Sequence, residues 1–115
     1  MAASFFDLGD KADFSPQKLQ KVALCESERL LFDLYCLEPG QAQKVHAHDN
    51  LDKIYFVMSG TPTVQLGDEA RPLRSGQAAY APAGVPHGVR NDTTDRATLL
   101  VFQARTPKEG RGPTG

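Results

Sequence analysis

The sequence predicts an all-β fold in a single domain, and three observations support this. The chain has 115 residues, which suits one compact domain with one core. Apolar residues recur in short runs with a period of two, and no helical period extends beyond two turns. Turn residues, mainly glycine, proline, asparagine and aspartate, separate these runs, and no internal repeat exceeds a strand pair.

The turn residues mark the boundaries of the predicted strands. After a turn at 15–18, they are expected at 20–26, 29–37, 53–59, 63–66, 71–73, 78–81, 88–90 and 97–104, and one more contains the histidines after Gly40. The strand at 29–37 is apolar on both faces, so we expect its outer face to be covered by the N-terminal arm or by a second subunit. In the strand at 53–59, Lys53, Tyr55 and Val57 share one face, because side chains alternate.

Composition argues against several classes of partner. Thirteen lysines and arginines nearly balance fourteen acidic residues, and there is no basic run, so nucleic acid and membrane partners are not expected. The apolar runs are too short to span a bilayer, and Asp7 and Asp10 interrupt any signal-peptide core. A cytoplasmic location is therefore expected, where Cys25 and Cys36 would be free thiols.

All three histidines of the chain lie in two short segments. His46 and His48 are two residues apart, so in a strand they share a face roughly 6.5 to 7 Å apart along the backbone. A third ligand must come from another segment, and His87 is the remaining imidazole. It follows a turn with two prolines and a glycine, which would aim its side chain.

These two segments resemble the two sequence motifs of the cupin superfamily. The second motif, a glycine, a proline, a glycine, a histidine and an asparagine at fixed spacing, is matched by Gly76, Pro82, Gly84, His87 and Asn91. The first motif is matched by Gly40, His46, His48 and Gly60. Its glutamate ligand is replaced here by Lys53, with Asp52 one residue earlier.

The resemblance implies a jelly-roll barrel, the double-stranded β-helix of small single-domain cupins of the cupin 2 kind, and a homodimer. We expect an arm over 1–20 that packs on the barrel or on a partner, the barrel over 21–105, and a flexible tail over 106–115. The predicted metal ligands are His46, His48 and His87, for one divalent transition metal ion per chain, Fe, Mn, Ni or Zn. Three-histidine centres have precedent in the family, in iron-dependent dioxygenases.

Lys53 at the glutamate position leaves several possibilities open, because an ammonium repels a nearby metal ion. The lysine either extends to solvent, or loses its proton, or replaces the metal as a fixed positive charge, and as a functional group it would pair with an anionic substrate or act as a base. Asp52 could supply a carboxylate only if the register shifts. Lys53 and Tyr55 are the candidate catalytic residues. Tyr80, Gln43 and Gln103 are weaker pocket candidates, and Asn91 is expected to stabilise the turn that follows it.

Two functions of different classes fit the sequence, which leaves open whether the protein is an enzyme. In the first, a three-histidine metal centre inside the barrel acts on a small molecule, as in a dioxygenase or an isomerase. In the second, the barrel binds a small molecule, sugar or anion without turnover, in a site where Lys53 replaces the usual glutamate and metal is not required. The fold alone does not decide between them.

Overall fold

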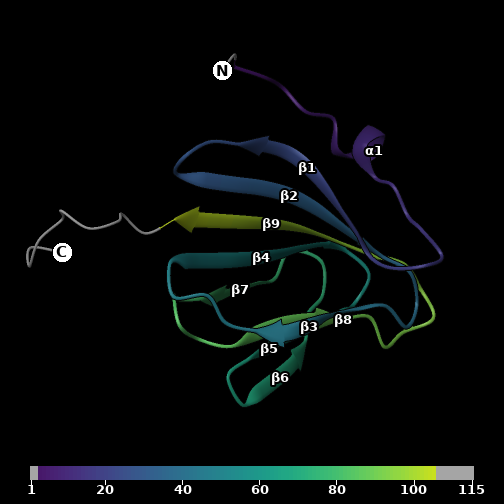
Figure 1. Ribbon diagram of the computed structural model, residues 1–115. Coiled ribbons are helices and arrows are strands. Elements are labelled where there is room, and N and C mark those ends of the chain that lie inside the picture. Colours follow the sequence, from purple (N-terminus) through teal and green to yellow (C-terminus); the bar gives the residue numbers. More distant parts are fainter. Residues whose placement is uncertain (1–2, 106–115) are drawn as a thin grey trace, which may run out of the picture.

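Two antiparallel β-sheets face each other in the structure, a computed structural model that describes residues 3–105 (Figure 1). One sheet has five strands in the order β1-β2-β9-β4-β7, and the other has four in the order β3-β8-β5-β6. The strands are β1 (Gln20–Glu26), β2 (Leu30–Leu37), β3 (Ala42–His46), β4 (Leu51–Ser59), β5 (Thr63–Leu66), β6 (Glu69–Pro72), β7 (Ala78–Ala81), β8 (His87–Arg90) and β9 (Ala97–Arg105). The predicted all-β jelly-roll fold is confirmed.

Some predicted boundaries differ from the observed ones. The strand expected at 71–73 is β6, which begins at Glu69, and a short helix, α1 (Leu8–Lys11), was not predicted. Asp7 caps this helix by accepting a hydrogen bond from the Gly9 N–H, and the helix has no buried residue, so no apolar period marks it. Within residues 3–105, no helix has the length and apolar character needed to cross a membrane. The predicted tail, 106–115, lies outside the described residues.

The interior lies between the two sheets. Along β4, Lys53, Tyr55 and Val57 are at most 1% exposed, whereas the intervening Ile54 and Phe56 are about 40% exposed on the outer face. This alternation confirms which face of the strand points inward. The core combines residues of both sheets: Tyr35, Leu37, Tyr55, Val57, Val64, Val89, Leu99 and Val101.

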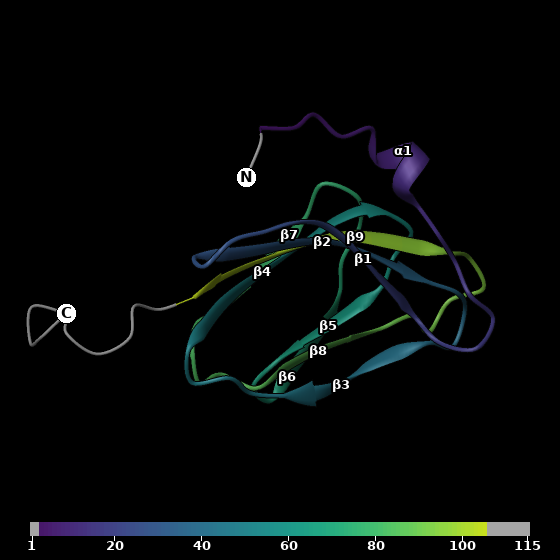
Figure 2. The same cartoon turned by 45° about the horizontal axis from the view of Figure 1, so that its top comes forward.

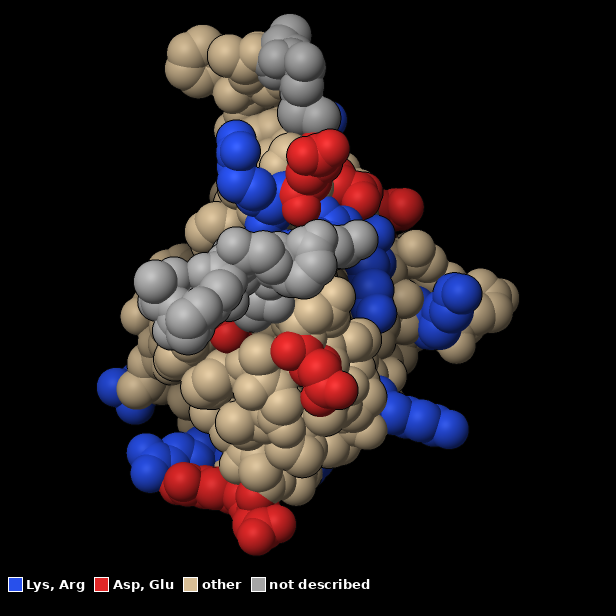
Figure 3. Space-filling view, turned by 60° about the vertical axis from the view of Figure 1, so that its left-hand side comes forward, with Lys and Arg blue, Asp and Glu red and all other residues tan. Residues whose placement is uncertain are grey.

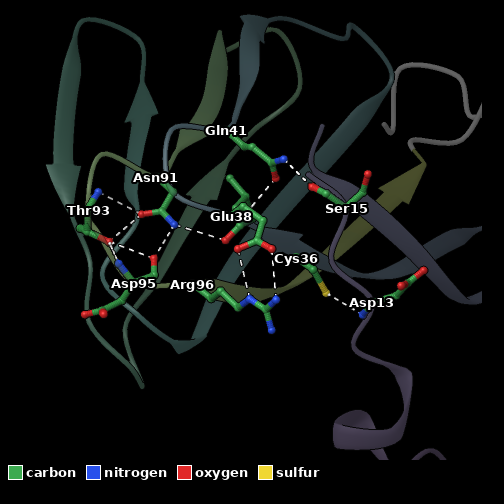
Figure 4. Close-up of polar contacts among 10 residues, drawn as sticks. Asp13, Ser15, Cys36, Glu38, Gln41, Asn91, Thr93, Asp95 and Arg96 are labelled. Carbon is green, nitrogen blue, oxygen red and sulfur yellow. Dashed lines mark hydrogen bonds and ion pairs between the residues drawn. The ribbon is translucent and has the colours of Figure 1, made fainter. Parts of the chain in front are cut away.

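The N-terminal arm runs beside the five-stranded sheet (Figure 2). The Asp13 N–H donates a hydrogen bond to Cys36 Sγ at 3.5 Å, and Gln41 Nε2 donates to the Ser15 carbonyl at 2.6 Å (Figure 4). Phe5, nearer the start of the arm, is fully exposed. Packing of the whole arm on the barrel or on a partner therefore stays a prediction.

Asn91 fixes the turn between β8 and β9. Its side chain is fully buried, and Nδ2 donates hydrogen bonds to the carbonyls of Leu37 and Asp95. Its Oδ1 accepts hydrogen bonds from the N–H and hydroxyl of Thr93 (Figure 4). The predicted role of Asn91 in this turn is confirmed, and the asparagine also ties the turn to the end of β2.

Candidate metal centre

The three histidines meet at one end of the four-stranded sheet. His46, the last residue of β3, lies opposite His87, the first residue of β8. His48 follows the end of β3 by two residues. The ring centroid of His46 lies 4.7 Å from that of His48 and 4.6 Å from that of His87, and the candidate ligand atoms of all three lie within 4.8 Å of one another.

A local irregularity of β3 turns His46 toward this site. The pairing of β3 with β8 shifts between Gln43, opposite Val89, and His46, opposite His87, so three steps on β3 match two on β8. Such a bulge changes the face to which later side chains point. As a result, both Gln43 and His46 contribute to the interior, although they are an odd number of residues apart.

Glycines allow the chain segments at the site to approach closely. A Cβ on Gly88, next to His87, would lie 2.9 Å from the Gln43 carbonyl oxygen, so only glycine fits between β3 and β8 here. Gly84 has a φ of +88°, and its N–H donates to the His48 carbonyl at 2.7 Å. The turn before His87 is therefore joined directly to the segment of His48.

Backbone carbonyls orient two of the imidazoles. His87 Nδ1 lies 2.9 Å from the Val85 carbonyl oxygen, and His46 Nδ1 lies 2.7 Å from the Lys44 carbonyl oxygen. With the proton on Nδ1, each ring keeps a free lone pair on Nε2, as metal-binding histidines do. His87 is 1% exposed, and its Nε2 is a buried polar atom without a hydrogen-bond partner among the described residues.

These residues fit a divalent transition metal ion. Burial lowers the pKa of His87 and of His48, and the nearby positive charge of Lys53 contributes, so both rings are neutral near pH 7 as ligands must be. Two nitrogens about 2.1 Å from one ion are at most about 4.2 Å apart. The largest distance between candidate ligand atoms, 4.8 Å, exceeds this value by less than about 1 Å, and small side-chain rotations would remove the difference. The three histidines are positioned to bind one ion.

Lys53 points into the barrel and does not reach solvent. The residue is 1% exposed, and its Nζ lies 5.5 Å from the ring centroid of Tyr35 and 5.1 Å from that of Tyr55. The possibility that the lysine extends to solvent is therefore wrong. Burial is the largest cause that lowers the pKa of Lys53, to about 8, and Lys21 adds to the effect. The side chain still holds its proton in most molecules at pH 7.

Two tyrosines and a glutamine form a hydrogen-bonded wall beside Lys53. The Tyr55 hydroxyl donates to Gln43 Oε1 at 2.9 Å, and Gln43 Nε2 donates to the Tyr35 hydroxyl at 3.2 Å. Burial raises the pKa of Tyr55, and it raises the pKa of Tyr35 to about 12. Both phenols therefore stay protonated near neutral pH, which favours a positioning role for Tyr55 over proton transfer.

The remaining candidates from the sequence differ in position, and one residue was missed. Asp52 Oδ1 accepts a hydrogen bond from the Ala83 N–H at 2.9 Å, and Asp52 is not among the grouped ligands that the described residues offer. Tyr80 is 54% exposed, whereas Gln103 is buried and lies directly opposite Lys53 on the neighbouring strand β9. Sequence reasoning missed Tyr35, although the alternation of β2 is the signal that places it on the inner face.

Comparisons with known proteins agree with this architecture. A family model described as "Cupin domain" matches residues 33–103. The crystal structure of TT1209 from Thermus thermophilus is 48% identical in sequence, covers 90% of this chain and 98% of that chain, and has a TM-score of 0.86. Similarity to SCO3923, an uncharacterized protein of Streptomyces coelicolor, is 38% identity over 71 residues.

The curated relatives are matched over part of their length. The aligned region covers 60% of this chain and 65% of SCO3923. For protein SchB of Streptomyces halstedii, which is 36% identical over 66 residues, it covers 57% of this chain and 47% of the relative. The match with TT1209, by contrast, spans nearly all of both chains.

Proposed function

Because the chain belongs to the cupin domain family, we propose that it is a small-molecule metalloenzyme in which His46, His48 and His87 hold one divalent transition metal ion. The observation that carries this proposal is the buried Nε2 of His87, which has no hydrogen-bond partner among the described residues and lies beside two further imidazoles. A buried nitrogen with a free lone pair costs free energy unless something binds it.

Each part of the site has a role in this proposal. When bound, the ion supplies a Lewis acid or redox centre for an oxygen-bearing substrate, and imidazole ligands suit Fe, Ni and Zn, with Mn also in the candidate set. The Val85 and Lys44 carbonyls hold the imidazoles of His87 and His46 in the ligating tautomer. His87 is buried in the barrel interior, whereas His46 and His48 are partly exposed to solvent. A dioxygenase or an isomerase is the proposed reaction class.

Lys53 and Tyr55 shape the substrate side of this site. Lys53 is a buried ammonium fixed on the five-stranded sheet, whereas the histidines belong to the four-stranded sheet and the segment that follows β3. A substrate between the sheets would meet the imidazoles on one side and the ammonium on the other. Tyr55, held by its hydrogen bond to Gln43, keeps its ring against the Lys53 side chain.

A second candidate function is binding of a small molecule, sugar or anion without metal and without turnover. The observation in its favour is Lys53 itself, which occupies the position where the family places a carboxylate ligand and which is buried there. An ammonium at that position weakens metal binding through charge repulsion and can replace the ion as a fixed positive charge.

Elemental analysis of protein purified without an affinity tag or chelator separates the two candidates. Protein is quantified by amino-acid analysis because the chain has no tryptophan. The proposal expects near one equivalent of a first-row transition metal, lost in His87→Ala and retained in the control Ala47→Ser, an exposed position between two ligands. Metal far below one equivalent that added Fe(II), Mn(II), Ni(II) or Zn(II) does not increase would support the second candidate instead.

We also propose that the protein forms a homodimer through the outer face of the five-stranded sheet. Ile54 lies between Phe102 and Tyr80 on neighbouring strands, and all three are at least 40% exposed. An exposed apolar cluster of this kind is typical of an interface. Light scattering of the purified protein tests this, and Phe102→Glu should produce a monomer with unchanged metal content.

A further inference from the structure

Lys53 is a buried positive charge without an acidic partner. Within residues 3–105 it makes neither a hydrogen bond nor an ion pair, and its near contacts are the faces of two tyrosine rings. Aromatic rings offset part of the lost hydration of an ammonium, but they do not supply a counter-charge. Asp33 attracts Lys53 only over a longer range. Burial raises the pKa of the Asp33 carboxyl group. The ligand-free site therefore has an unbalanced positive charge.

The proposed metal ion adds to the same excess. Neutral imidazoles contribute no charge, so an ion with two positive charges and Lys53 with one would share one interior. Tyr55 lies close to both groups, because its ring centroid is 5.1 Å from Lys53 Nζ and 6.2 Å from the ring centroid of His87. A glutamate in place of Lys53 would cancel one of the two metal charges, whereas the lysine adds a third. In a medium of low dielectric constant, such a site selects an anion.

A groove with positive charge leads to the same wall of the barrel. It has a volume of about 750 Å³ and lies between residues 17–21 and residues 40–44, at the edge strands β1 and β3. Its charged lining residues are Lys18, Lys21 and Lys44, without an acidic one. Gln43 lines this groove and also bonds both tyrosines beside Lys53.

The charge in this groove is local and not a general property of the surface. The chain has a formal net charge of −1, and on the face in Figure 3 lysine and arginine side chains lie among acidic ones. Lysines confined to one groove raise the local concentration of small anions at its mouth. Lys21 also links the groove to the interior, since its Nζ and that of Lys53 each lie 5.5 Å from the Tyr35 ring centroid.

We infer that the ligand of this site is a small carboxylic acid anion whose carboxylate pairs with the Lys53 ammonium while a second oxygen of the same molecule lies against the three histidines. This inference rests on the proposed three-histidine centre for the second contact, and on Lys53 alone for the first. The carboxylate supplies the counter-charge that the protein lacks, and the second oxygen donor suits a divalent ion.

The test is calorimetric titration of the metal-loaded protein, freed of unbound metal, with malonate, with pyruvate and with the uncharged analogue malonamide. We expect malonate and pyruvate to bind and malonamide not to bind. Lys53→Met and Lys53→Gln should each weaken malonate binding roughly 10- to 100-fold, as expected for loss of a charged hydrogen bond in a buried site. Two replacements are made so that the test can still be carried out if one variant fails to fold. Circular dichroism shows which variants are folded. Lys11→Gln, which removes a charge from α1 away from the groove, is the matched control and should bind like the wild type.

Several outcomes overturn the inference: malonate affinity in the Lys53 variants within threefold of the wild type, equal affinity for malonamide, or no binding of either acid. Metal content is measured on the same samples. If the wild type holds no metal, the proposed enzyme fails. In that case malonate is titrated into the metal-free wild type and into metal-free Lys53→Met. The comparison tests the contact between the carboxylate and Lys53 separately from the metal, because only Lys53 differs between the two proteins.

Discussion

Replacing Lys53 by methionine should stabilise the metal-free, ligand-free protein. Methionine has a similar length and an apolar side chain that packs well against aromatic rings. The wild type buries an ammonium whose pKa falls from 10.5 to about 8, because burial disfavours the charged form. At pH 7 this shift corresponds to a loss of about 3 kcal/mol in the free energy of unfolding.

The same shift predicts how the difference varies with pH. The unfolded chain holds the lysine proton more tightly than the folded chain, so the wild type becomes more stable as pH rises from about 8 toward 10.5. The loss in the free energy of unfolding caused by burying the ammonium is fully present below pH 8 and falls to about 1 kcal/mol at pH 9.5. Between pH 7 and 9.5 the free energy of unfolding of the wild type should therefore rise by about 2 kcal/mol relative to that of Lys53→Met. Burial also raises the pKa of Cys36, but that thiol is present in both proteins and cancels in the difference.

Urea unfolding at pH 7 and pH 9.5, followed by circular dichroism, measures both quantities. Lys11→Met, at an exposed position of α1, is the control and should change stability by less than about 0.5 kcal/mol at either pH. The reasoning about an unpaired buried charge is refuted if Lys53→Met is less stable than the wild type at pH 7 and the difference between them does not depend on pH.

Three further predictions concern the metal site and the frame around it. Lys53→Glu should raise metal affinity roughly tenfold or more over Lys53→Gln, measured by competition with a chelating dye, and equal affinities would show that the carboxylate does not reach the ion. Gly60→Ala should lower the free energy of unfolding in urea by about 2 to 5 kcal/mol, because Gly60 has a φ of +78° and a Cβ there would lie 2.5 Å from a backbone oxygen. Gly67→Ala, with positive φ but open space, should cost only about 1 to 2 kcal/mol, and similar losses in both would contradict the packing argument. Asn91→Ala should lower the free energy of unfolding by about 2 to 4 kcal/mol, because it leaves buried backbone groups unpaired. Thr94→Ala, at an exposed position in the same turn, should leave it nearly unchanged. Thermal unfolding of both variants measures this, and a larger loss in Thr94→Ala would contradict the role of Asn91.

The inward face of β4 could be predicted from the sequence because it depends on a local rule. Side chains alternate along a regular strand, and this was enough to place Lys53, Tyr55 and Val57 inside. The grouping of the three histidines could be predicted from motif spacing. The first feature needs only the order of residues within one short segment, and the second needs the resemblance of two segments to two known motifs.

The surroundings of Lys53 could not be predicted, because they depend on how strands align. Tyr35 reaches the lysine from β2, two strands away across β9, and no local pattern specifies that alignment. The bulge in β3 places Gln43 and His46 on the same side, against strict alternation. Helix α1 escaped prediction because its four residues bury no side chain, so no apolar period marks it.

The position of β9 has a consequence for synthesis of the chain. This strand follows the other eight in the sequence, yet it lies at the centre of the five-stranded sheet, between β2 and β4 (Figure 1). Until residues 97–105 leave the ribosome, both neighbours have an open edge and their apolar faces lack support, so a nascent chain at that stage can pair with other chains. A chain truncated before Ala97 should therefore aggregate, whereas a chain that ends after Arg105 should not.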